Sequence, residues 1–161
     1  MRRIFIDANI FIYILTADPR YSDKCFQLLE GVEEGKIMAF ISTLIVNEVS
    51  HVLMVLRATE LVGASDLGAV FRTLPDVKKD CQQKVRVFYQ YLDYLISLGS
   101  LKVEPIDYTI ACASIEYAER FGLLPSDAVH VACCCRLGIE EMATNDGDFE
   151  AVEFLRLWKP I

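Results

Sequence analysis

Short, fully apolar runs alternate along the chain with longer segments in which apolar residues recur every three or four positions. A run that is apolar on both faces is typical of a buried strand in a parallel sheet, and the longer spacing is typical of an amphipathic helix. The runs predict strands at 4–6, 37–41, 101–104, 141–144 and 153–157. The spacings predict helices at 9–15, 21–34, 43–56, 85–98 and 107–121, and a further helix that ends at Gly138.

This alternation of strands and helices predicts an α/β fold. We expect one three-layer domain over residues 1–161, with a parallel sheet of four to five strands and helices on both faces. Between 57 and 86 the pattern loosens around Gly63, Gly68 and Pro75, so we expect a helical excursion within that domain.

Asp7 directly follows the first apolar run, and a helical pattern begins two residues later. In a parallel α/β sheet, ligands bind in the crevice beyond the carboxyl ends of the strands. An acid placed there is poorly solvated unless a positive charge shares the crevice, so Asp7 is the first candidate for a functional site. The alternative is that Asp7 only caps the helix that starts near Asn9.

Glu48 interrupts an apolar stripe on the helix after the second strand, where positions 44, 48, 52 and 55 are Leu, Glu, Val and Val. An unpaired carboxylate that faces the core is costly. A pair with His51, one turn further on, is the structural alternative. Because this helix starts directly after a neighbouring strand, we favour a carboxylate that faces the same crevice as Asp7.

Two more acids occupy comparable places. Asp127 heads the apolar stripe of the last long helix, although the helix dipole alone also favours an Asp in a first turn. Asp146 follows the predicted strand 141–144 in a tight turn that also holds Asp148. If the strands that precede Asp7 and Asp146 are neighbours, all four acids converge at one end of the sheet.

Carboxylates packed this closely repel one another and take up protons unless a cation lies among them. Oxygen ligands favour a hard ion such as Mg²⁺ or Mn²⁺, which commonly activates water and holds a phosphoryl group during in-line displacement. The sequence therefore predicts metal-dependent hydrolysis of a phosphoester. It contains no P-loop, no Asp-x-Asp after the first strand, no G-x-S-x-G elbow and no acidic doublet of a receiver domain.

The composition is acidic, with 16 Lys and Arg against 23 Asp and Glu and a net charge of −7. Such a balance ordinarily argues against nucleic-acid binding, but without the four candidate acids the excess of acids over bases would be only three. The hydrophobic content of 53% indicates an apolar surface shared with a partner. Lys78, Lys79, Lys84 and Arg86 form the only basic concentration, which is either a solvated helix face or a rim that follows the phosphates of a substrate.

Arg2 and Arg3 before an apolar stretch resemble a secretory signal, but Asp7 and Asn9 interrupt the stretch and no cleavage site follows. No apolar run is long enough to span a membrane. None of the six cysteines forms a C-x-x-C pair, which makes a zinc site improbable, and buried thiols fit a reducing cytoplasm.

The ordered set of motifs resembles the PIN domain family, and most nearly its VapC-like ribonuclease toxins. The motifs are Asp7-Ala8-Asn9 after an apolar strand, Glu48, Ser126-Asp127-Ala128-Val129-His130-Val131-Ala132 and Ala143-Thr144-Asn145-Asp146-Gly147-Asp148-Phe149. The resemblance implies a Rossmann-like sheet in the order 3-2-1-4-5 and Mg²⁺- or Mn²⁺-dependent cleavage of RNA. It implies that Asp7, Glu48, Asp127 and Asp146 are the metal-binding, catalytic acids.

Under the same resemblance, Asn9 and Thr144 would orient the acids by hydrogen bonding, and Asp148 would be an accessory acid or a turn former. A homodimer and a cognate antitoxin are implied as partners. Two alternatives stay open: a stand-alone nuclease that processes RNA, and a non-catalytic PIN-like interaction module in which the acids form a structural network.

Overall fold

The structure is a computed structural model that describes residues 1–63 and 67–161. Its strands are β1 (Arg2–Ile6), β2 (Ile37–Ser42), β3 (Leu101–Glu104), β4 (Glu141–Ala143) and β5 (Arg156–Trp158). Its helices are α1 (Ala8–Leu15), α2 (Ser22–Glu33), α3 (Thr43–Val62), α4 (Leu67–Val77), α5 (Gln82–Ser97), α6 (Tyr108–Phe121) and α7 (Pro125–Leu137), with a 3₁₀ helix, η1, at Asp148–Ala151.

The five strands form one sheet in the order β3-β2-β1-β4-β5, which confirms the predicted order. All four pairings are parallel. The central strand β1 lies between β2 and β4, where Phe5 is paired with Phe40 on one side and Met142 on the other. Ile4, Phe5 and Ile6 are fully buried, as a central strand covered on both faces requires.

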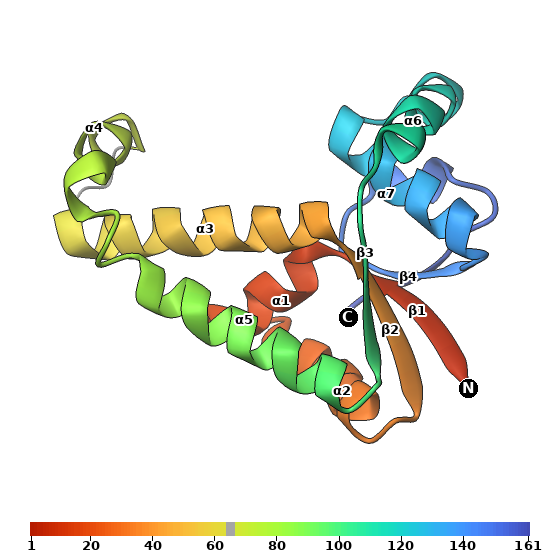
Figure 1. Cartoon of the computed structure of the whole chain (residues 1–161), viewed down its shortest axis with the longest axis horizontal. Coiled ribbons are helices and arrows are strands. Elements are labelled where there is room, and N and C mark those ends of the chain that lie inside the picture. The colour runs from red at the N-terminus through yellow and green to blue at the C-terminus, as the bar shows by residue number, and fades with distance from the viewer. Residues whose placement is uncertain (64–66) are drawn as a thin grey trace.

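Helices cover both faces of the sheet, as predicted. In Figure 1, α1, α2, α3 and α5 lie on one side, and α6 packs with α7 on the other. Ser42 caps α3 and Asp107 caps α6, each by accepting a hydrogen bond from a backbone N–H three residues later. Gly138 ends α7 with a φ of 61°, a left-handed conformation that favours glycine.

The helix that carries Glu48 is longer than predicted. α3 continues past Leu56 to Val62 and projects beyond the sheet, with α4 at its far end (Figure 1). Ala58, Val70 and Cys81 are fully buried where α3, α4 and the start of α5 meet, and they form a small core apart from the main one. The excursion therefore includes the last turns of α3, all of α4 and the first turn of α5.

The predicted bounds of the last strand, 153–157, are also wrong, because β5 begins at Arg156 and ends at Trp158. The 3₁₀ helix and a turn occupy the residues between Asp148 and β5. All six cysteines are free thiols. Within the residues described, no helix combines the length and apolar character needed to cross a bilayer.

Candidate metal centre

Asp7 lies at the carboxyl end of β1 and at the first turn of α1. Its backbone N–H donates to the carbonyl of Ala143 at 3.0 Å, which continues the pairing of β1 with β4. Its Oδ1 accepts a hydrogen bond from the Ala8 N–H at 2.7 Å, so Asp7 does cap the helix. Asp7 is only 8% exposed and lies at the end of β1, so the residue that caps α1 also lies at the edge of the sheet where a site is expected.

The second carboxylate oxygen of Asp7 is held by the loop that follows β4. Thr144 donates its hydroxyl to Asp7 Oδ2 at 2.6 Å, and the Asn9 amide donates to the same oxygen. The Thr144 hydroxyl in turn accepts the N–H of Asp146 at 3.0 Å. These bonds tie the ends of β1 and β4 together, and both Asn9 and Thr144 donate a hydrogen bond to Asp7.

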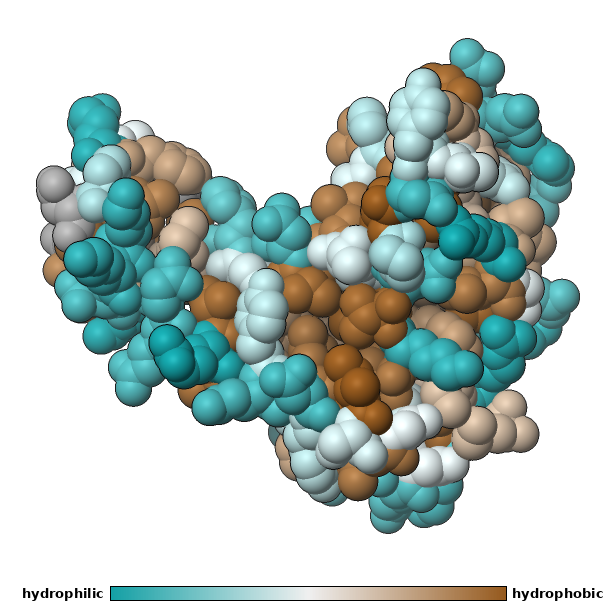
Figure 2. Space-filling view, in the orientation of Figure 1, coloured by the Kyte–Doolittle hydropathy of each residue, from teal (hydrophilic) through white to brown (hydrophobic). Residues whose placement is uncertain are grey.

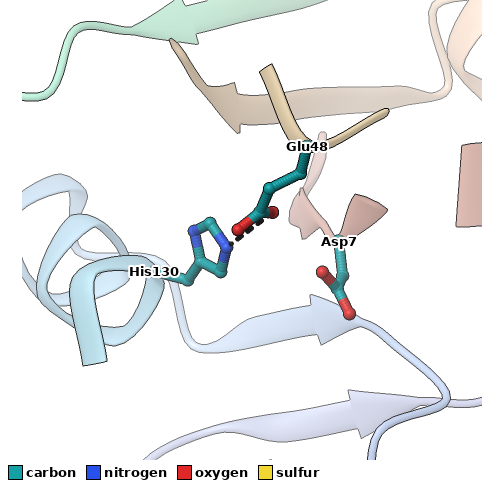
Figure 3. A group of neighbouring side chains, drawn as sticks. All are labelled: Asp7, Glu48 and His130. Carbon is teal, nitrogen blue, oxygen red and sulfur yellow. Dashed lines mark hydrogen bonds and ion pairs between the residues drawn. The ribbon is translucent and has the colours of Figure 1, made fainter. Parts of the chain in front are cut away.

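Glu48 reaches the same place from the second turn of α3. Asp7, Glu48 and His130 each offer a ligand atom, and these atoms lie within 4.8 Å of one another (Figure 3). Nε2 of His130 lies 3.3 Å from Oε2 of Glu48. The considered pairing of Glu48 with His51 is wrong, because His51 is exposed and stacks on Phe71 with ring centroids 6.4 Å apart.

His130 is the one member of this group that the sequence analysis did not select. It lies three residues after Asp127 on α7, so both side chains face the same direction from the helix. The spacing of three residues between Asp127 and His130 is the sequence feature that could have identified His130 as a member of the site. The partner of His130 is 82 residues away in sequence, and only the folded arrangement reveals it.

Burial and nearby charges perturb the acids of this site. Burial raises the pKa of Asp7, while hydrogen bonds from Thr144 and Ala8 act in the opposite direction. Burial and, to a smaller extent, the negative charges of Asp146, Asp7 and Asp148 raise the pKa of Asp127 to about 6, whereas His130 opposes the shift. Asp127 is therefore close enough to the other acids to feel their charge.

Asp146 is half-buried, and Asp148 is exposed at the start of η1. The backbone N–H of Asp148 donates to Oδ1 of Asp146 at 2.9 Å, so the turn fixes the Asp146 carboxylate. The Asp148 side chain contributes its charge to the cluster, while Phe149 anchors the turn in the core with 1% of its surface exposed.

The basic residues lie away from these acids, at the end of α4 and on α5. Lys84 forms an ion pair with Glu60 at 2.6 Å. Lys78, Lys79 and Arg86 are exposed.

The donor set fits a hard divalent cation. Among the residues that the structure describes, no Lys or Arg forms an ion pair with Asp7, Asp127 or Asp146. Buried carboxylates without a cationic side chain are costly, and a metal ion would remove that cost. The carboxylate oxygens of Asp7 and Glu48 are close enough to share one ion with little movement.

A parallel sheet in the order 3-2-1-4-5, with acids near the carboxyl ends of β1 and β4, defines a Rossmann-like class of α/β protein, in which ligands bind beyond the carboxyl ends of the strands. The family model described as "PIN domain" matches residues 4–155. The chain therefore belongs to the PIN domain family.

Curated relatives and solved structures agree with this assignment. The chain is 24% identical to Ribonuclease VapC6 of Methanocaldococcus jannaschii, over 97% of this chain and 96% of that protein. It is 28% identical to Ribonuclease VapC2 of the same organism, over 96% of this chain and 92% of that protein.

Among solved structures, VapBC2 from Rickettsia felis bound to a promoter DNA fragment matches with a TM-score of 0.59 and 16% identity, over 98% of both chains. Mycobacterium tuberculosis VapC20, a toxin that cleaves the sarcin–ricin loop, matches with a TM-score of 0.59 and 15% identity, over 94% of this chain and 96% of that one. At these identities the two structures support the fold.

Proposed function

We propose that this protein is a metal-dependent endoribonuclease and the toxin of a type II toxin–antitoxin pair. Its membership of the PIN domain family supports the proposal, as do two nearly full-length relatives that are named ribonucleases. The sarcin–ricin loop cleaved by the structural neighbour VapC20 supports RNA as the substrate class.

The observation that carries the proposal is that Asp7 and Glu48, which lie far apart in the chain, each offer a ligand atom within 4.8 Å of the other. The four candidate acids lie at the end of β1, on α3, on α7 and in the loop after β4: Asp7, Glu48, Asp127 and Asp146. The first two offer ligand oxygens to one point, and the charges of Asp7 and Asp146 act on Asp127. Such an arrangement is unfavourable by itself and becomes favourable around a cation.

We assign these four acids as the ligands and catalytic residues, with Mg²⁺ or Mn²⁺ as the ion, because carboxylate oxygens select hard cations. Such an ion, when bound, neutralises charge on a phosphodiester and acidifies water. Asn9 and Thr144 orient Asp7 for this task through their hydrogen bonds to Oδ2. Asp148 sets the local negative charge and, through its backbone, the position of Asp146.

RNA would extend from the acids toward Lys78, Lys79, Lys84 and Arg86. Glu60, the partner of Lys84, is twelve residues beyond Glu48 on α3, so this ion pair lies roughly 18 Å from Glu48 along the helix axis. A single RNA strand that spans this distance would contact the protein through several of its nucleotides.

The proposed partners are a cognate antitoxin and a second copy of this chain, in the cytoplasm. A toxin–antitoxin complex from Klebsiella pneumoniae matches with a TM-score of 0.56 and 18% identity, over 98% of both chains, and supports the first partner. A largely apolar groove of about 430 Å³ lies between α1, α3 and α5, lined by Leu15, Leu53 and Val87 with Arg57 and Lys84. Apolar side chains also gather over the middle of the face shown in Figure 2, as a protein partner would require.

The decisive experiment measures cleavage of a structured RNA with Mg²⁺, with Mn²⁺ and with EDTA. Cleavage by the wild type should require a metal, and Asp7→Asn should abolish it without loss of fold, because Asn preserves the helix cap. Asp107→Asn is the matched control, since Asp107 also caps a helix but lies on α6 outside the acid cluster. Cleavage that survives Asp7→Asn or EDTA would contradict the proposal.

A further inference from the structure

Glu48 and Asp7 are held in the site in different ways. The Asp7 carboxylate accepts hydrogen bonds from Ala8, Asn9 and Thr144. Among the described residues, the Glu48 carboxylate has one polar partner within hydrogen-bonding distance, Nε2 of His130 at 3.3 Å. The Glu48 side chain is 29% exposed, so without this contact its flexible carboxylate would be free to turn toward water.

His130 is built into the core. The residue is 1% exposed, and its ring lies 5.9 Å from the ring of Phe5, centroid to centroid. Nδ1 is buried and has no hydrogen-bond partner, whereas Nε2 faces Glu48 (Figure 3). The imidazole therefore has a fixed orientation with one apolar side and one polar side.

The surroundings of His130 favour one of its two neutral tautomers. With the proton on Nε2, the ring donates to the Glu48 carboxylate, and Nδ1 buries only a lone pair. With the proton on Nδ1, a buried N–H has no acceptor, which is unfavourable. Histidines that ligate metals through one nitrogen normally donate the other N–H to a partner, and Nδ1 of His130 has none among the described residues.

We propose that His130 is a positioning residue that donates its Nε2–H to Glu48 and holds that carboxylate toward Asp7, without itself ligating the metal. This inference rests on the proposed metal site and deepens it by assigning the imidazole that stands beside the acids. If His130 does not ligate the metal, all protein ligands of the ion are oxygen atoms, although a histidine nitrogen lies close to them. Such a site favours Mg²⁺ and Mn²⁺ over Zn²⁺, which prefers nitrogen and sulfur ligands.

The first test examines the wild-type protein loaded with Mn²⁺. Pulsed electron paramagnetic resonance detects the magnetic coupling of a directly bound nitrogen to Mn²⁺. We expect no imidazole coupling. In the metal-free protein, nitrogen-15 NMR should show the His130 proton on Nε2, and Glu48→Gln should shift that resonance. An imidazole coupled directly to Mn²⁺, a proton on Nδ1, or absence of Mn²⁺ binding would each overturn the proposal.

The second test uses two variants of similar polarity. The amide nitrogen of Gln can take the place of Nε2, and that of Asn takes the place of Nδ1. His130→Gln should keep the Mn²⁺ affinity, measured by calorimetry, within about threefold of wild type, and His130→Asn should lower it about tenfold or more. Equal losses in both variants would show that donation to Glu48 is not the role of His130.

Both readouts are independent of RNA cleavage. A protein with the expected Mn²⁺ spectrum and variant affinities that cleaves no RNA would refute the proposed function alone. If the variants fail to fold, the wild-type spectra still decide the assignment. Tight binding of Zn²⁺ with imidazole coordination would contradict the inference even if RNA cleavage were observed.

Discussion

Asp7 combines a structural role with a functional one in a single carboxylate. One oxygen caps α1, and the other receives the Asn9 and Thr144 side chains. An N-cap of this type contributes about 1 kcal/mol to stability, but burial raises the pKa of the same group. The hydrogen bonds compensate for part of the burial, and they also fix the direction in which the carboxylate can approach a cation.

Thr144 is the residue on which this arrangement depends most directly. Its buried hydroxyl donates to Asp7 and accepts from Asp146 and Asn9. Thr144→Val keeps the shape but leaves these groups unpaired, so we expect a loss of about 1–3 kcal/mol in the free energy of unfolding and a further rise in the pKa of Asp7. Urea denaturation measures the loss. Thr144→Ser keeps the hydroxyl and should lose only about 1 kcal/mol, so equal effects of both substitutions would contradict this account.

The raised pKa of Asp127 predicts how stability depends on pH. Its value of about 6 in the folded state lies above that of an unfolded Asp, so the metal-free folded state binds the proton more tightly. This contribution to stability is present below about pH 4 and is lost as the pH rises through 6. Asp127→Asn should remove this dependence and, at pH 8 in EDTA, stabilise the protein by on the order of 1 kcal/mol, since partial exposure reduces the effect. Urea denaturation at pH 5 and pH 8 measures both changes.

Asp107 provides a control, because its pKa is shifted in the opposite direction to that of Asp127. The Ile110 N–H and then Arg136 lower the pKa of Asp107 below its ordinary value. Its stabilising contribution is therefore present at neutral pH and lost as the pH falls through the folded-state pKa. Asp107→Asn should lower stability at pH 8 and have less effect in acid. Stability profiles that shift in the same direction for both variants would contradict the assigned causes.

The sequence predicted the acids of the site better than their partners. Asp7 directly follows one apolar run and Asp146 comes three residues after the end of another, so a parallel sheet places both near one edge whatever the details of packing. The pairing of Glu48 could not be predicted in this way. Local spacing offered His51, one turn away, as the alternative partner, but Glu48 contacts His130 on α7 instead, and the rotation of a helix against a sheet depends on packing between distant segments.

At the scale of the elements, α3 joins the main core to a smaller one. Its first turns carry Ile45 and Val49 into the main core, and Ala58 near its end packs with Val70 and Cys81. Most strands and helices were predictable because each has a clear apolar pattern, whereas the strand order was implied by the resemblance to the PIN domain family. The end of α3 was not, because Gly63 and the loosened pattern after Arg57 left no marked apolar stripe for the small core.

The small core should open independently of the main one. Val70→Ala removes buried methyl groups there and should cost roughly 1–3 kcal/mol, confined to α4 and the adjoining ends of α3 and α5. Hydrogen exchange should show faster exchange in these segments and unchanged protection in β1 and β4. Val49→Ala, the same substitution in the main core, should instead reduce protection throughout the sheet. Uniform loss of protection in the Val70 variant would mean that the two cores unfold together.

At the scale of the whole molecule, the protein is acidic overall but has one local group of basic residues. The net charge is −7, yet Lys78, Lys79 and Arg86 are exposed together near the α4–α5 junction, away from the acids. A bound divalent cation would reduce the negative charge at the site, and the basic residues would supply attraction to RNA phosphates. Affinity for RNA should therefore depend on a small number of phosphate contacts and should fall as the salt concentration rises.

Replacing Lys78, Lys79 and Arg86 together by Gln should weaken RNA binding and leave the cleavage rate at saturating RNA nearly unchanged. Loss of three phosphate contacts to a single strand should reduce the slope of log affinity against log salt by about 2. Fluorescence anisotropy at several salt concentrations with the non-cleaving Asp7→Asn protein measures this slope. In the control variant, Gln replaces Lys24, Lys36 and Arg156. These substitutions remove the same amount of positive charge, but near the amino ends of β2 and β5. Because that edge lies opposite the acids, the control should retain the wild-type slope, and an equal reduction in both variants would reveal an effect of net charge alone rather than contact with RNA.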